Sequence, residues 1–184
     1  MSAIRLRGAT SGTTDVVAAA IAGDGVLTLP SGTGTLATAA YVDAAVAAGG
    51  KVLQIVSAST DTPVASSSST YAATGLTATI TPSSDTSKVL VLVNQNGLRK
   101  QQNTSISLQL NRGVTTISTF AYAAYTNSTS DNDVGGTSVS ILDAPATASA
   151  VTYSTTFNST SNAAITNVQL GPVMSTIILM EISA

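Results

Sequence analysis

The sequence contains no cysteine, no histidine and no tryptophan. Without cysteine the chain has no disulfides, no thiolate metal sites and no cysteine nucleophile. Without histidine it has neither a Ser-His-Asp triad nor a histidine metal ligand. These absences remove the commonest catalytic and zinc-binding arrangements, and we predict no enzyme activity, no cofactor and no metal site.

Charged and aromatic residues are also scarce, at 9% and 4% of the 184 residues. A globular domain has roughly 25% charged residues. The net charge of −2 gives no attraction to nucleic acid. Val, Ile and Leu are too frequent for a disordered chain. Small, uncharged side chains favour packing against copies of the chain over a free monomer.

Long apolar segments are missing as well. No run approaches the roughly 20 residues of a membrane-spanning helix, so we expect no membrane insertion. The first residues, MSAIRLRGATSG, lack the apolar region of a secretory signal peptide. This pattern predicts synthesis in a cytoplasm without Sec export.

Residues 1–36 are rich in Gly, Thr and Ala and are predicted to form an N-terminal strand arm. Ile4 and Leu6 alternate with arginines, which favours a short strand. Residues 14–21 and 26–29 also have strand character and flank the turn sequence AGDG. A single hairpin is marginal alone, so we expect this one to pair with strands of other copies.

Residues 37–50 contain the one convincing helix pattern, TAAYVDAAVAAGG. Thr38 is a suitable N-cap, and a glycine pair can end the helix. Ala39, Val42 and Val46 have coiled-coil-like spacing and are the predicted residues of an oligomer axis. The helix is too short to be stable alone. The alternative is a short surface helix packed on its own domain.

Residues 51–184 contain about nine or ten short strand patterns separated by turn sequences. This spacing predicts an all-β domain, an antiparallel β-sandwich or jelly roll. The most apolar strand, KVLVLVNQ at residues 88–95, is predicted to be central and buried on both faces. TNSTSDNDVGG, at residues 126–136, is predicted to be a long polar loop.

The order of these segments resembles tailed-bacteriophage fibre and spike proteins. The resemblance lies in LTLP at residues 27–30, the junction GTLATAAYVDAAVAAGG, and the later pieces GGKVLQIV, GLTATITPSSDTSKVLVLV, LNRG, LDAPATASAVTYSTTF and STIILMEI. It implies a homotrimer on the virion surface, made in the host cytoplasm. The arm would attach to other phage structural proteins through apolar residues Ile4, Leu6, Val26, Leu27 and Leu29.

For such a protein we expect host attachment by multivalent display of the C-terminal domain. The candidate receptor contacts, to a host glycan or protein, are Arg99 and Lys100 in a polar run and Tyr122 and Tyr125 beside the 126–136 loop. Tyrosine supplies contact area at low entropy cost. The alternatives are an exposed hairpin tip for the basic pair and ordinary packing for the tyrosines.

Two other functions stay open. The alternative to a fibre or spike is a head decoration protein that stabilises a capsid, and the more remote alternative is a carbohydrate-active domain. The latter would need a pair of carboxylates, and its candidates are Asp131, Asp133, Asp143 and Glu181. Asp131 and Asp133 also offer oxygen ligands to Ca²⁺, although the rest of an EF-hand pattern is missing, which favours a solvated loop.

Overall fold

The computed structural model describes residues 3–7, 13–17, 51–125, 129–161 and 164–183. The chain divides into two compact units, residues 1–43 and 44–184. The predicted helix at 38–50 lies outside the described residues. The same holds for the predicted axis residues and for part of the predicted attachment set, namely Ala39, Val42, Val46, Val26, Leu27 and Leu29.

The first unit contains two described strands, β1 (Ala3–Arg7) and β2 (Thr13–Val17). They pair antiparallel, with Ile4 opposite Val16 and Leu6 opposite Thr14. The strand predicted at Ile4 is therefore confirmed. The described partner of β2 is β1, whereas the sequence predicted pairing with residues 26–29, which lie outside the described residues. Two strands alone are marginally stable, because they present no second layer to bury a face.

The described residues of the second unit form an all-β sandwich of ten antiparallel strands. These are β3 (Val52–Thr60), β4 (Val64–Ser66), β5 (Ala72–Ile80), β6 (Lys88–Lys100), β7 (Ile106–Arg112), β8 (Thr115–Ala124), β9 (Asn132–Asp143), β10 (Val151–Ser159), β11 (Thr166–Val168) and β12 (Ser175–Ile182). The predicted all-β class and antiparallel arrangement are confirmed; the finer jelly-roll assignment stays a prediction.

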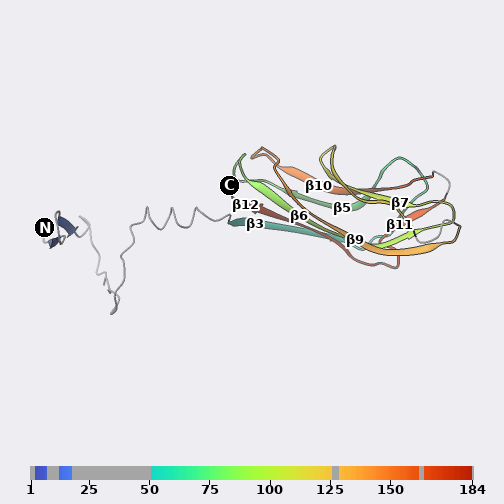
Figure 1. Cartoon of the computed structure of the whole chain (residues 1–184), viewed down its shortest axis with the longest axis horizontal. Coiled ribbons are helices and arrows are strands. Elements are labelled where there is room, and N and C mark those ends of the chain that lie inside the picture. The colour runs from blue at the N-terminus through green and yellow to red at the C-terminus, as the bar shows by residue number, and fades with distance from the viewer. Residues whose placement is uncertain (1–2, 8–12, 18–50, 126–128, 162–163, 184) are drawn as a thin grey trace. The chain divides into compact units, whose positions relative to one another are not determined.

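The two sheets of the sandwich face each other (Figure 1). One has four strands in the order β5-β10-β7-β8. The other has six, with β3, β12, β11 and β4 on one side of β6 and β9 on the other. β6 is central, as predicted, and its inward Val89, Val91 and Val93 are buried. Its outward Leu90 and Leu92 are only half-buried, so the prediction that both faces are buried was wrong.

β6 is also longer than predicted, because residues 96–100 continue the strand. Arg99 lies opposite Asp133 and Lys100 opposite Asn132 of β9. The predicted polar loop at 126–136 therefore becomes strand from Asn132 onward. Backbone pairing does not require apolar side chains, and the register shift near Gly97 lets these polar segments pair despite their irregular pattern.

The core between the sheets consists of two apolar clusters. The larger contains Leu76, Ala78, Ile80, Val89, Val91, Val93, Leu110, Val151, Tyr153, Ile177 and Leu179. The smaller contains Leu98, Ile106, Leu108, Phe157 and Val168. Along β5, β6 and β10 a buried polar residue separates members of the two clusters, so the core is interrupted at one level of the sandwich.

A hydrogen-bonded polar belt, made of Thr74, Gln95, Thr155, Gln169 and Ser175, occupies that level. Thr155 Oγ1 donates to Gln95 Oε1 at 2.9 Å, and Gln95 Nε2 donates to Ser175 Oγ at 3.1 Å. Gln169 Nε2 reaches the same serine oxygen at 3.2 Å. Thr74 and Thr155 hydroxyls lie 2.6 Å apart. The belt crosses from one sheet to the other, and a slip of any strand would leave buried polar groups unpaired.

A second polar link between the sheets lies beyond the larger cluster. Asp143, at the end of β9, accepts two hydrogen bonds of 2.9 Å from Arg112 Nη1 on β7. Tyr153 on β10 donates its hydroxyl to Asp143 Oδ2 at 2.6 Å. Burial, this hydrogen bond and the charge of Asp143 raise the pKa of Tyr153, against the opposing charge of Arg112. The tyrosine therefore remains a donor, and the link holds β9 to the four-stranded sheet.

We predict that Tyr153→Phe lowers the free energy of unfolding by about 1.5–3 kcal/mol, because it removes a hydrogen bond to a charged acceptor. Urea denaturation followed by circular dichroism measures the change. The matched control is Tyr122→Phe, at a side chain that is 82% exposed. That control should change stability by less than about 0.5 kcal/mol, and equal effects of the two substitutions would contradict the role given to Tyr153.

Candidate functional site at the loop end of the sandwich

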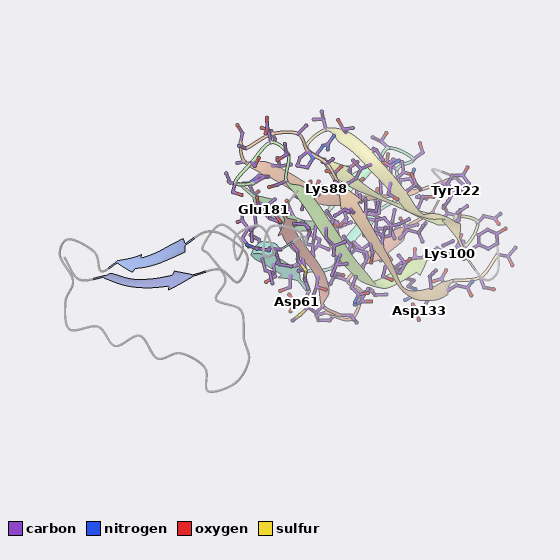
Figure 2. The ribbon with its side chains drawn as sticks, turned by 60° about the vertical axis from the view of Figure 1, so that its left-hand side comes forward. Asp61, Lys88, Lys100, Tyr122, Asp133 and Glu181 are labelled. Atoms are coloured by element: carbon purple, nitrogen blue, oxygen red, sulfur yellow. The ribbon has the colours of Figure 1, made fainter. Side chains whose placement is uncertain are left out.

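The candidate contact residues lie at one end of the sandwich, which we call the loop end. Lys100, Tyr122 and Asp133 are grouped there, and Glu181 lies toward the opposite end (Figure 2). Tyr122 is 82% exposed and Tyr125 is 52% exposed. Both tyrosines are therefore available for contact, in keeping with their predicted role.

Lys100 is different, because it is fully buried. Its Nζ donates to the backbone oxygen of Gln102 at 2.6 Å and lies 6.0 Å from the centre of the Tyr125 ring. The prediction that Lys100 contacts a receptor was therefore wrong. Gln95 points inward, and after the register shift Leu98 and Lys100 do so too. Without that shift the alternation would have directed Lys100 outward.

Arg99 is partly exposed and is held by two carboxylates. Its Nη2 lies 3.2 Å from Asp131 Oδ2, and its Nε lies 3.7 Å from Asp133 Oδ1. The second distance is too long for a hydrogen bond, so that contact is electrostatic only. Asp131 Oδ1 also accepts from the Gln102 backbone at 3.0 Å. With one positive and two negative side chains, the cluster does not present a free positive charge.

The same contacts bear on the Ca²⁺ hypothesis for Asp131 and Asp133. A guanidinium group already interacts with both carboxylates and supplies the positive charge that a cation would bring. In the part of the chain that the structure describes, no group of three or more acidic, histidine or cysteine side chains is arranged to hold a metal ion. The arrangement favours a solvated loop with an ion pair.

A hollow of about 440 Å³ opens beside this ion pair. It is lined by Asn96, Gly97, Leu98, Asp133, Gly135, Leu170, Gly171 and Val173. Its walls come from β6, β9 and the segment between β11 and β12. Leucine and valine side chains with one carboxylate and one amide suit a ligand with both apolar and hydroxyl groups. No pattern in the sequence predicts this hollow, because its lining comes from three distant segments.

Gly97 is required for the wall of the hollow. Its φ is +62°, and a Cβ atom there would overlap the backbone of Gln169 and Leu170. The close approach lets Gln169 N donate to Asn96 O at 2.9 Å and Leu170 N donate to Gly97 O at 3.0 Å. Glycine is the residue that accepts both the conformation and the contact.

Backbone strain concentrates near the loop end. Three of the four described non-glycine residues with positive φ lie next to residues of this region. Gln102 is two positions after Lys100, Ala123 directly follows Tyr122, and Gln169 directly precedes Leu170, which lines the hollow. Such conformations each cost about 1–3 kcal/mol and persist where the surrounding structure enforces them. The loop end is therefore a shaped and constrained surface.

The remaining candidate carboxylates have structural partners. Asp143 is bound by Arg112 and Tyr153. Glu181 is buried and accepts hydrogen bonds from Gln54 Nε2 at 2.6 Å and from the backbone and hydroxyl of Ser83 at 2.7 and 2.6 Å. Burial alone would raise the pKa of Glu181, but hydrogen bonds from Ser83, Gln54 and Ser87 lower it from 4.5 to about 2. Neither group has the free geometry of a catalytic acid.

A scan against protein-family models and a search of curated proteins found no match to this chain. The described residues contain no helix long and apolar enough to cross a membrane.

We predict that Gly97→Ala destabilises the protein more than Gly113→Ala does. Gly113 has a similar φ of +56°, but a Cβ atom there meets nothing within 4 Å. The control should cost about 1–2 kcal/mol from the left-handed conformation alone. Gly97→Ala adds overlap with backbone and should cost about 2–5 kcal/mol in urea denaturation. Equal costs would show that the backbone contact at Gly97 has no energetic role.

A second prediction concerns acid stability. Because the pKa of Glu181 is lower in the folded protein than its ordinary 4.5, its contribution is present above that value and is lost as pH falls towards 2. The free energy of unfolding of Glu181→Gln should therefore fall less steeply than that of the wild type between pH 5 and 2. Urea titrations at several pH values measure the slopes. Asp61→Asn, at an exposed carboxylate, is the control and should keep the wild-type slope.

Proposed function

We propose that the chain is a structural protein of a tailed-phage particle, a homotrimeric fibre or spike displayed on the virion surface and used in host attachment. The observation that carries this proposal is the loop end. Exposed Tyr122 and Tyr125, the Arg99 ion-pair cluster and the hollow beside Gly97 lie on one constrained end of a rigid sandwich. Rigid aromatic and polar groups of this kind are typical of recognition surfaces.

The attachment role proposed for the N-terminal arm, residues 1–36, rests on strand pairing. β1 and β2 form a two-stranded sheet in which Ile4 and Leu6 belong to one strand. Such a sheet gains stability from further strands, which other copies or a particle protein can supply. In the proposal, residues 1–36 attach to the particle and Ala39, Val42 and Val46 pack near the threefold axis. The sandwich then faces outward with a jelly-roll arrangement.

The chemistry proposed is binding without catalysis. The described carboxylates that a hydrolase would use are engaged by arginine, tyrosine, serine or glutamine side chains. Binding by three copies in each trimer, and by many trimers on a particle, raises a weak contact to useful avidity. The receptor class that fits the hollow and the tyrosines is a host surface glycan or protein.

The test uses the phage that carries the chain and its host. We expect antibody labelling to mark the particle tail, and excess purified protein to slow adsorption. Tyr122→Ala with Tyr125→Ala should weaken this competition by roughly tenfold, as for the loss of aromatic contact residues. The control is Val114→Ala, a fully exposed side chain in the β7–β8 turn.

Labelling of the head, with adsorption unaffected by the protein, would refute the fibre assignment. In that case removal of the protein should lower the heat tolerance of the capsid, as a decoration protein requires. Shortening of host polysaccharide by the purified chain would instead support the carbohydrate-active alternative.

A further inference from the structure

The two outer faces of the sandwich differ in chemistry. The outer face of the four-stranded sheet is polar, and its side chains bond to one another. Thr79 and Thr152 hydroxyls lie 2.8 Å apart, and Asn111 Nδ2 donates to Thr156 Oγ1 at 3.0 Å. A face of this kind suits water. The outer face of the six-stranded sheet is apolar over one part, and it becomes polar at the row Ser59, Thr176, Asn94 and Ser138.

Strand register defines this apolar face. Ile55, Met180, Leu90 and Leu142 form one row across β3, β12, β6 and β9. The next row is Ser57, Ile178, Leu92 and Ser140. Ile55 is 61% exposed and Leu142 is 54% exposed, while the middle residues of both rows are half-buried. Contiguous apolar surface across four strands marks an interaction site.

The surface of the apolar face is uneven and contains two hollows. A hollow of about 300 Å³ lies between β12 and β9 across β6, lined in part by Leu92, Ser138 and Ile178. Another of about 270 Å³ lies between β3 and β12 and includes Ser57 and Ile178. Ile178 therefore stands between two hollows that short serines leave open. Each copy of the chain thus has both exposed apolar side chains, Ile55 and Leu142, and hollows of a size to receive one.

Charge gives no preference for a charged partner. Among the side chains of the two rows and of the rows next to them, the single ionised group is Lys88. A charged macromolecule would therefore meet a single charged side chain on this face. An uncharged apolar surface matches another copy of itself.

The width of the face distinguishes a sheet from a helix as its partner. Four strands span about 14 Å between the outer two, at about 4.8 Å per step. One helix, about 10 Å across, leaves Ile55 or Leu142 uncovered. Around a threefold axis the faces of two neighbouring copies meet it from either side, so that both outer strands are covered.

We propose that the apolar face of the six-stranded sheet packs against the same face of other copies of this chain. The proposal deepens the homotrimer of the proposed function and rests on it for the number of copies. It assigns the contact to Ile55, Leu90, Leu142, Ile178 and Met180. The polar outer face and the loop end are then left to solvent and to recognition.

Cross-linking of the full-length chain tests which faces meet. The sequence has no cysteine, so one introduced thiol reports on one position. Met180→Cys lies in the middle of the apolar face, and the control Thr119→Cys lies on the opposite, polar face. A short bismaleimide should join chains of the Met180→Cys protein and leave those of the Thr119→Cys protein separate. Cross-linking of the control alone, or of neither, overturns the proposal.

Sedimentation then measures the energetic role of the face. The wild type should have a mass that is a multiple of 18.3 kDa. Ile55→Lys with Leu142→Lys places unpaired charges at exposed positions, which a monomer tolerates, and should weaken association roughly 100-fold. Ala73→Lys with Thr119→Lys adds the same charge to the polar face and should leave association unchanged.

Equal behaviour of the two lysine pairs, or a monomeric wild type at tens of micromolar, overturns the proposal. Particle labelling and adsorption competition do not depend on this result. If association fails the tests above but the antibody labels the particle tail, only the proposed interface is refuted. If association passes these tests but the antibody does not label the particle, only the phage role is refuted.

Discussion

The register shift at Gly97 in β6 is the constraint on which the rest of the sandwich depends. Before it, Val89, Val91, Val93 and Gln95 point inward. After it, Leu98 and Lys100 do so, and Arg99 is turned out towards the carboxylates of the loop end. The missing side chain at Gly97 also admits the segment at Leu170, which joins β11 to β12 and closes the wall of the hollow. One glycine thus connects the core, the sheet and the candidate site.

The polar belt fills one level of the core with threonine, serine and glutamine and without an aromatic side chain. These side chains hydrogen-bond to one another, with Gln169 Oε1 the one belt oxygen left without a partner. These bonds add directional contacts where apolar packing would be non-directional. The abundance of Ser and Thr is therefore partly a property of the interior.

The sandwich has three chemically distinct surfaces. The polar face bonds its own side chains, the apolar face leaves its side chains half-covered, and the loop end combines exposed tyrosines with an ion pair. Such a division suits a subunit that contacts copies through one surface and a receptor through another. It fits the proposed display protein, in which assembly and recognition use separate groups.

The strand pattern of the sequence determined the fold class of the second unit, because alternating apolar residues can bury one face only as antiparallel strands. It indicated about nine or ten strands and identified β6 as central. It did not reveal that β6 continues to Lys100 or that β9 begins at Asn132, because pairing of polar segments depends on backbone partners that alternation does not encode. Lys100 was assigned to the surface for the same reason.

For the candidate site, the sequence selected Tyr122, Tyr125 and Arg99 by residue type and neighbourhood alone. Tertiary structure decided their surroundings: the carboxylates that hold Arg99, the burial of Lys100, and a hollow built from three segments. It likewise decided that Leu90 and Met180, which any hydropathy pattern would place inside, share an outer face. Composition and periodicity fix which residues can be strands, but inside and outside are assigned when the sheets meet, because each side chain's exposure depends on the layer that packs against it.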